Sequence, residues 1–306
     1  MELKKIKDLH KIVNQYNQKK RLVLCSAADE HALEAVIHAF HEGIVEPVLV
    51  GVKPELKKTA ERLNFDLKQV EVHYERDMHA VIKKSITMVI SGNADILMKG
   101  RLSTADLLSG VLNKDWGLKT KRFLSHLAIF EVPKYHKLIA MTDVAMNILP
   151  TLNHKIGIIN NAVQFLKKLG SKNPKIAALA AVEMVNEKMP ATTDAALLAI
   201  MQRRGQIKDC LIDGPLAFDN AVSFESKKSK GLGGSVAGNA DVLLVPNIEA
   251  GNMLYKSFVF FANAKVCGLV LGAPFPIVLT SRADSEETKF NSILLAAAST
   301  SKFNEK

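Results

Sequence analysis

The sequence predicts an α/β protein with mainly parallel sheets, and two observations lead to this fold class. Apolar runs of four to six residues alternate with amphipathic helical stretches along almost the whole chain, as in repeated strand–helix units. The chain has 306 residues and is 48% hydrophobic, which is enough for two domains of ordinary size with one core each. We therefore expect two α/β domains.

The first 113 residues read as four strand–helix units. Short runs rich in valine, leucine and isoleucine predict the strands, and apolar residues three or four positions apart predict the helices. The expected strands are 21–27, 47–51, 70–74 and 95–100, and the helices that follow them are 29–43, 54–64, 78 to about 91 and 103–113.

The pattern changes after Trp116 and Gly117. Two apolar runs, 123–132 and 137–143, are separated only by a proline-containing turn, which predicts an antiparallel hairpin. Strand–helix alternation then resumes to the end of the chain. The remaining expected elements are helices near 152–169 and from 284 to about 299, and strands 175–184, 208–213, 241–246, 265–272 and 276–280.

No low-complexity tract or flexible linker separates the two expected domains. We expect the chain to cross between them near residue 120 and again near residue 273. The first domain is then 1–122 plus 273–306, and the second is 123–272.

Composition excludes several classes of protein. No apolar run approaches the roughly 20 residues that span a bilayer, and the charged amphipathic start of the chain lacks the apolar core of a signal peptide. Cys25, Cys210 and Cys267 lie in or at the end of apolar runs, without metal-ligand spacing, and read as reduced core thiols. We expect a cytoplasmic protein with no contact with membranes and no metal.

The net charge of +10 indicates an anionic partner. Nucleic acid is not expected, because the lysines are scattered over helix surfaces, aromatic residues make up only 6%, and there is no basic tail. A small polyanionic substrate explains the excess charge.

Ser281 and Arg282 are the first candidates for a substrate site. Ligands of open parallel sheets bind beyond the carboxyl ends of the strands, and here a buried strand ends in Ser281-Arg282 just before an acidic helix start. A hydroxyl, a cation and helix N-terminal amides at one point favour an anion. The alternative is structural: Ser281 begins the helix, and Arg282 pairs with Glu286.

Lys99, Arg101, Ser103 and Thr104 form a second candidate cluster. They place two cations after a strand and two hydroxyls at the next helix start, which is a phosphate site on physical grounds. Ordinary capping by Ser103 is the alternative interpretation.

Three further candidates lie in the second expected domain. Lys256 follows Asn252 by one helical turn, so both side chains can face the same side, although a solvent-exposed lysine is the usual outcome. Asn220 follows a proline-containing turn and is a candidate substrate contact.

Separated patches of the chain resemble the phosphate acetyl/butyryltransferase family. They include DGPLAFDNA (213–221), AGNMLYK (250–256) and LTSR (279–282), within the longer runs 235–264 and 267–289. The resemblance implies two α/β/α lobes, with the last helix returning to the first lobe and the active site in an interdomain cleft. It also implies acyl-CoA, CoA, phosphate and acyl phosphate as substrates and products, no tightly bound cofactor, and a homodimer.

The resemblance also suggests roles for individual residues. In related acetyl enzymes the matching Ser-Arg pair lies in the active site, so Arg282 is expected to bind the phosphoryl or carbonyl oxygen and Ser281 to donate to the developing oxyanion. Glu287 is the expected base for the CoA thiol, although Asp284 and Glu287 also have the spacing of a capping box. Thr288 occupies the place where acetyl enzymes have an aspartate.

The departures from the acetyl pattern favour the butyryl branch of the family. The acetyl enzymes usually have an arginine near the position of Ser109 and lack the Lys99/Arg101 pair. We therefore expect a phosphate butyryltransferase activity, with acetyl transfer as the first alternative. A non-catalytic relative that binds polyanions is the alternative from another class.

Overall fold

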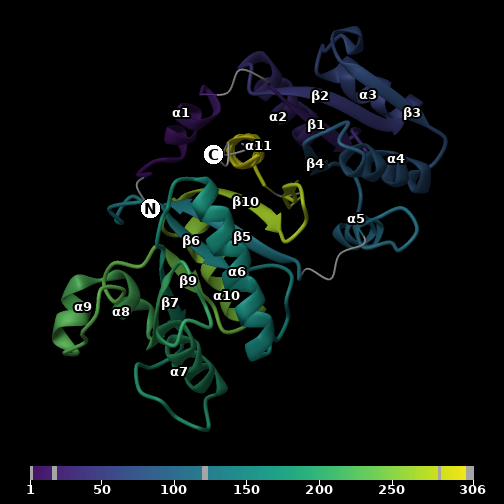
Figure 1. Ribbon diagram of the computed structural model, residues 1–306. Helices are drawn as coiled ribbons and strands as arrows, with labels where there is room; N and C mark the ends of the chain where they lie inside the picture. The colour runs from purple at the N-terminus through teal and green to yellow at the C-terminus, as the bar shows by residue number, and fades with distance from the viewer. Residues whose placement is uncertain (1–2, 16–18, 119–122, 282–283, 301–306) are drawn as a thin grey trace. The chain divides into compact units, whose positions relative to one another are not determined.

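A computed structural model describes residues 3–15, 19–118, 123–281 and 284–300 (Figure 1). By internal contacts the chain forms two compact units: Met1–Asp8 with Phe123–Val266, and Leu9–Arg122 with Cys267–Lys306. We call them the hairpin unit and the terminal unit. This division differs from the expected one at residues 1–8 and 267–272. Compact units need not coincide with folding domains, so the expected domain boundaries stay a prediction.

The terminal unit is built on a mainly parallel sheet with strand order β3-β2-β1-β4-β11-β10. Only the pairing of β10 with β11 is antiparallel. The apolar runs of β1, β2, β4 and β11 are largely buried, which is why they read as nearly continuous hydrophobic stretches, whereas the edge strand β3 has no buried residue. The strands are β1 (Lys20–Cys25), β2 (Val45–Val52), β3 (Glu71–Glu75), β4 (Ile96–Lys99), β10 (Lys265–Leu271) and β11 (Ile277–Val278).

Four helices of the terminal unit, α2, α4, α5 and α11, begin at residues with side chains that accept from backbone N–H groups. Asp29, Asp77, Ser103 and Ser285 are such caps, and each satisfies an otherwise unpaired donor of the first turn. The helices are α1 (Leu9–Val13), α2 (Glu30–His41), α3 (Lys53–Arg62), α4 (Met78–Ile90), α5 (Thr104–Val111) and α11 (Glu286–Ser299), with a 3-10 turn at Leu67–Gln69.

The last helix, α11, belongs to the terminal unit and packs on α1 and α2. Nearly all of its residues from Lys289 to Ser299 are buried. A helix at the surface of a protein would bury only one face. α11 therefore lies in one compact unit with α1 and α2, and its expected membership of the first domain stays a prediction.

The hairpin unit has the strand order β5-β6-β9-β7-β8. β5 (Ser125–Glu131) and β6 (Ile139–Thr142) are antiparallel, so the predicted hairpin is confirmed, and the other pairs are parallel. The other strands are β7 (Lys175–Leu179), β8 (Leu211–Leu216) and β9 (Val242–Leu244). The helices are α6 (Leu152–Lys168), α7 (Pro190–Arg203), α8 (Phe218–Val222), α9 (Phe224–Ser229) and α10 (Ile248–Phe260), with a 3-10 turn at Ile6–Asp8.

The core of the hairpin unit includes Phe130, Met141, Leu243 and Phe258. Phe130 and Phe258 meet edge to face, with ring centroids 5.1 Å apart, which is a favoured aromatic geometry. This contact fixes α10 on the sheet beside β5 and β6.

Two strand predictions are too long. The expected strand 175–184 ends at Leu179, and Met184 is 71% exposed, so its apolar side chain belongs to a connecting segment. The expected strand 276–280 has only Ile277 and Val278 in the sheet. Within the described residues, no helix is long and apolar enough to cross a membrane.

Candidate active site

Ser281 and Arg101 follow two neighbouring strands of the terminal unit at the same edge of its sheet. β11 pairs with β4 in parallel, with Ile277 opposite Leu97 and Val278 opposite Met98. Each candidate lies three residues beyond the last of these paired residues, and both side chains are exposed. Parallel pairing therefore brings a hydroxyl and a cation to one edge, as the position after the strands predicted.

The turn that carries Arg101 is fixed against the end of β1. The amide of Gly100 donates to the carbonyl of Cys25 (2.8 Å), and the amide of Arg101 donates to that of Ser26 (2.9 Å). In return, the hydroxyl of Ser26 donates to the carbonyl of Arg101 (3.0 Å). A Cβ atom at Gly100 would overlap the Ser26 carbonyl oxygen, so this close approach requires glycine.

Lys99, the other cation predicted in this cluster, is buried. Its side chain is only 6% exposed, and its Nζ donates to the carbonyls of Gly100 and Leu102, each at 3.3 Å. The ammonium group thus lies against the backbone of the same turn that carries Arg101. Its contact with substrate stays a prediction.

Ser103 and Thr104 begin α5. The amide of Asp106 donates to the hydroxyl of Ser103 (3.0 Å), so the capping interpretation of Ser103 is confirmed. Both side chains are exposed at the positive end of the helix, where an anion is favourable. A substrate role for the pair stays a prediction.

Ser281 lies in a turn closed by Asp284. The Ser281 amide donates to a carboxylate oxygen of Asp284 (2.6 Å), and the Asp284 amide donates to the Ser281 carbonyl (3.2 Å). We call the hydrogen-bonded pair Ser281 and Asp284 the serine turn. Arg282 lies outside the described residues, so its expected role stays a prediction.

Lys289 contacts the serine turn and was not among the residues predicted from the sequence. It is 2% exposed, and its Nζ donates to the carbonyls of Ser281 (2.9 Å) and Asp284 (2.7 Å). A signal was present: Lys289 lies four and seven positions before Ile293 and Ala296, so it shares their buried helix face.

The helix start after the serine turn corrects the predicted capping box. Ser285 is the N-cap, and its hydroxyl accepts from the Thr288 amide (3.2 Å), because the carboxylate of Asp284 is already bound to the Ser281 amide. Glu286 lies 2.8 Å from Nδ1 of His38. Glu287 is exposed in the first turn of α11, and its role as a base stays a prediction.

The hairpin unit holds three other candidates. Asn220 is fully buried, its amide donates to Glu183 at 3.4 Å, and its Oδ1 has no partner among the described residues. Asn252 is half-buried and Lys256 exposed, one turn apart on α10. Substrate contact by these residues stays a prediction.

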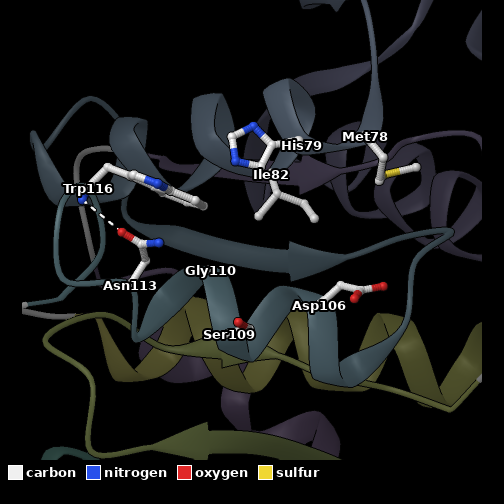
Figure 2. A pocket seen from close by; sticks show the side chains of 8 residues that line it. All are labelled: Met78, His79, Ile82, Asp106, Ser109, Gly110, Asn113 and Trp116. Atoms are coloured by element: carbon white, nitrogen blue, oxygen red, sulfur yellow. Dashed lines mark hydrogen bonds between the residues drawn. The ribbon is translucent and has the colours of Figure 1, made fainter.

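A cavity of about 430 Å³ lies between α4 and α5 (Figure 2). Figure 2 shows Trp116 and Ile82 on one side and Asp106 and Ser109 on α5. The lining includes one carboxylate and neither lysine nor arginine, so the cavity suits a neutral group better than a phosphate. The lining residues are Met78, His79, Ile82, Asp106, Ser109, Gly110, Asn113 and Trp116.

The cysteines are free and buried, as the sequence predicted. Burial raises the pKa of the Cys25 thiol to about 12, so this group is a poor nucleophile at neutral pH. Within the described residues, no group of three or more histidine, cysteine, aspartate or glutamate side chains could hold a metal ion.

Comparison with known proteins identifies the family. The model of the family described as "Phosphate acetyl/butaryl transferase" matches residues 4–86 and 73–297. The chain belongs to this family. The predicted relationship to the phosphate acetyl/butyryltransferases is therefore confirmed.

Relatives in this family match over nearly their whole length. The phosphate butyryltransferase of Clostridium acetobutylicum is 45% identical over 294 residues, covering 95% of this chain and 98% of that protein. The phosphate acetyltransferase of Thermotoga maritima is 42% identical, covering 94% and 98%. Among solved structures, a branched-chain phosphotransacylase from Enterococcus faecalis has a TM-score of 0.81 at 34% identity, covering 92% and 99%.

The candidate residues of this phosphate acetyl/butyryltransferase family member divide between its two units. The terminal unit provides Ser281, Glu287, Lys99, Arg101, Ser103 and Thr104, and the hairpin unit provides Asn220, Asn252 and Lys256. The expected cleft between the two lobes stays a prediction.

Proposed function

We propose that this protein transfers a short acyl group between coenzyme A and inorganic phosphate, giving acyl phosphate and CoA, with butyryl as the preferred group. The similarity to a phosphate butyryltransferase over nearly the full length of both chains carries the proposal. The edge formed by Ser281 and Arg101 supports it, because acyl transfer to phosphate needs donors and a cation at one point.

The reaction consists of one displacement at the thioester carbonyl. An oxygen of phosphate attacks the carbonyl carbon, a carbon–oxygen bond forms, and the carbon–sulfur bond breaks. In this direction Glu287 delivers a proton to the leaving thiolate, and in the reverse direction it removes the proton from the CoA thiol.

The other groups bind and orient the two anions. Ser281 donates to the oxygen that becomes negative during attack, and Arg282 holds the phosphate. Arg101, with the exposed N-terminus of α5, attracts phosphate groups to the same edge. Holding both substrates in one ternary complex supplies a large part of the rate gain.

Acetyl transfer is the competing activity, and a specific observation favours it. A phosphate acetyltransferase is 42% identical to this chain, which is only a little less than the butyryltransferases. Acetyl-CoA is therefore the main competing substrate in the test of activity.

The free thiols and the exposed apolar side chains of the enzyme bear on its location and its assembly. We place it in the cytoplasm, since Cys25, Cys210 and Cys267 are all free thiols. A homodimer is favoured by large apolar side chains on the hairpin unit, such as Phe260 and Phe261, which are 78% and 90% exposed. Coenzyme A acts as a substrate, and no tightly bound cofactor is part of the mechanism.

One experiment tests the activity: phosphate-dependent release of CoA from acetyl-, propionyl-, butyryl- and branched acyl-CoA. We expect release only when phosphate is present and the highest kcat/KM with butyryl-CoA. The highest kcat/KM with acetyl-CoA would instead make the protein an acetyltransferase. Absence of release together with salt-dependent DNA binding would replace the enzyme with a polyanion-binding protein.

A further inference from the structure

Lys289 is a buried cation in an unfavourable position. It lies in the first turns of α11, close to the positive end of the helix, where a cation is disfavoured. Its side chain is 2% exposed, and loss of hydration lowers the pKa of its ammonium group. Methionine or leucine could fill the same space at lower cost, so packing alone does not account for a lysine here.

The ammonium group forms two hydrogen bonds with the serine turn. It donates to the Ser281 carbonyl at 2.9 Å and to the Asp284 carbonyl at 2.7 Å. The carboxylates of Asp284 and Asp29 attract it, and this attraction partly offsets the cost of burial. One side chain therefore ties both ends of the turn to α11.

The backbone of Ser281 is held on both sides. Its amide donates to Asp284, and its carbonyl accepts from the Asp284 amide as well as from Lys289. The direction of the exposed Ser281 side chain follows from this backbone. Loss of the Lys289 ammonium group would remove one hydrogen bond from the Ser281 carbonyl and one from the Asp284 carbonyl.

We propose that Lys289 is a positioning residue that fixes the serine turn, and with it the Ser281 hydroxyl, in the geometry that acyl transfer requires. This inference rests on the proposed function, in which Ser281 donates to the developing oxyanion. Lys289 itself does not touch substrate. It acts through two backbone carbonyls, and catalytic donors lose much of their effect when they move by about 1 Å.

The test compares Lys289→Met and Lys289→Arg with the wild type in phosphate-dependent CoA release. Methionine retains volume but removes both hydrogen bonds, and we expect kcat to fall at least about tenfold, with KM for butyryl-CoA within about threefold. Arginine retains donors and charge, so its kcat should exceed that of the methionine variant. If Lys289 had a purely structural role, the methionine variant would have a lower melting temperature but a kcat close to that of the wild type.

Lys137→Met is the matched control. Lys137 is also a largely buried lysine that donates to a backbone carbonyl, that of Asn239 (3.0 Å), and to the Asp241 carboxylate (2.7 Å). It precedes β6 in the hairpin unit and belongs to no candidate cluster. This variant should lose stability and retain wild-type kcat.

The outcomes separate this inference from the proposed function. Wild-type CoA release with unchanged kcat in folded Lys289→Met would overturn the inference alone. A wild type without phosphate-dependent release would overturn both. Should Lys289→Met fail to fold, Lys289→Gln takes its place: reduced kcat at a wild-type melting temperature supports the inference, and wild-type kcat refutes it.

Discussion

At the scale of single residues, Glu287 can be separated from its acidic neighbours. Because Ser285 caps α11, Glu287 is not needed to begin the helix. Glu287→Gln should therefore leave the melting temperature within about 1 °C of the wild type and lower kcat by about a hundredfold, since an amide cannot accept the thiol proton. Steady-state kinetics and thermal unfolding measure both effects.

Glu286→Gln is the control for this prediction. Glu286 bonds to His38, whose ring stacks on Phe290 with centroids 4.2 Å apart, so it has a structural partner. Its substitution should reduce stability slightly and leave kcat nearly unchanged. Wild-type kcat in both variants would remove the carboxylate from the mechanism.

Arg101 should contribute to substrate binding rather than to folding. Its backbone is fixed by bonds with Ser26, whereas its side chain is exposed. We expect Arg101→Ala to raise KM for phosphate or for the CoA ester by about tenfold, the loss of one charged contact. Arg204→Ala, at an exposed position after α7, is the control, and an equal KM in the two variants would exclude Arg101 from the site.

Lys289 shows how a residue with a proposed functional role can be overlooked in a sequence, although its spacing from Ile293 and Ala296 carries a signal. A lysine after three acidic or hydroxyl residues at a helix start reads as an exposed partner for Asp284 or Glu286. Its burial depends on α1 and α2, which are more than 240 residues away in the chain, and only the folded structure brings them together. Ser281 was accessible to sequence reasoning, since strand ends carry a local pattern.

At the scale of elements, the junction between the turns after β1 and β4 allows a sharp test. A methyl group at Gly100 would meet the carbonyl oxygens of Cys25 and Ser26, and these belong to backbone that cannot move without disturbing β1. We expect Gly100→Ala to lower the free energy of unfolding by at least about 2 kcal/mol. Urea unfolding measures the loss.

Gly233→Ala provides the matched control, because a Cβ atom there would have no heavy atom within 4 Å. It should change the free energy of unfolding by less than about 0.5 kcal/mol. Equal stability of the two variants would mean that the turn after β4 can shift away from β1 without cost.

Asp241, directly before β9, should make the stability of the hairpin unit sensitive to acid. Burial alone would raise the pKa of Asp241, but hydrogen bonds from Lys137 and from the Lys175 amide outweigh it and hold the pKa below its ordinary value. A lowered carboxyl pKa stabilises the fold above the unfolded value of about 3.9, and this contribution is lost as pH falls through the folded pKa.

Asp241→Asn should therefore be less stable than the wild type at pH 7 and lose less stability on acidification. Urea unfolding between pH 3 and pH 7 gives both curves. Parallel curves for the two proteins would show that Asp241 does not carry the acid sensitivity.

The positions of most strands and helices could be predicted from the sequence, but some of their ends could not. Strand–helix alternation located β1 to β4 and their helices, because buried parallel strands carry a strong apolar signal. It overestimated β7, since the apolar residues Met184 and Val185 are exposed in a connection. The spacing of Asp284 and Glu287 suggested a capping box, whereas the observed N-cap is Ser285. The carboxylate of Asp284 accepts from the Ser281 amide, and spacing alone does not reveal this contact.

At the scale of the whole molecule, the terminal unit is discontinuous, and its C-terminal part completes its core. α11 contributes Ile293, Leu294 and Leu295, all at most 1% exposed, to the packing on α1 and α2. Burial of each such side chain stabilises a protein by about 1.5–3 kcal/mol. These three alone amount to a large part of the 5–15 kcal/mol that is usual for a domain.

A chain that ends at residue 285 should therefore fail to form the terminal unit, even though every strand of its sheet is present. We expect loss of cooperative thermal unfolding for this unit, binding of a dye specific for exposed apolar surface, and no CoA release. A chain that ends at residue 300 is the control, because it retains α11 complete, and it should unfold at the wild-type temperature. Cooperative unfolding of the shorter chain with intact acyl transfer would show that α1, α2 and the sheet form a sufficient core without α11, contrary to the burial that the structure shows for this helix.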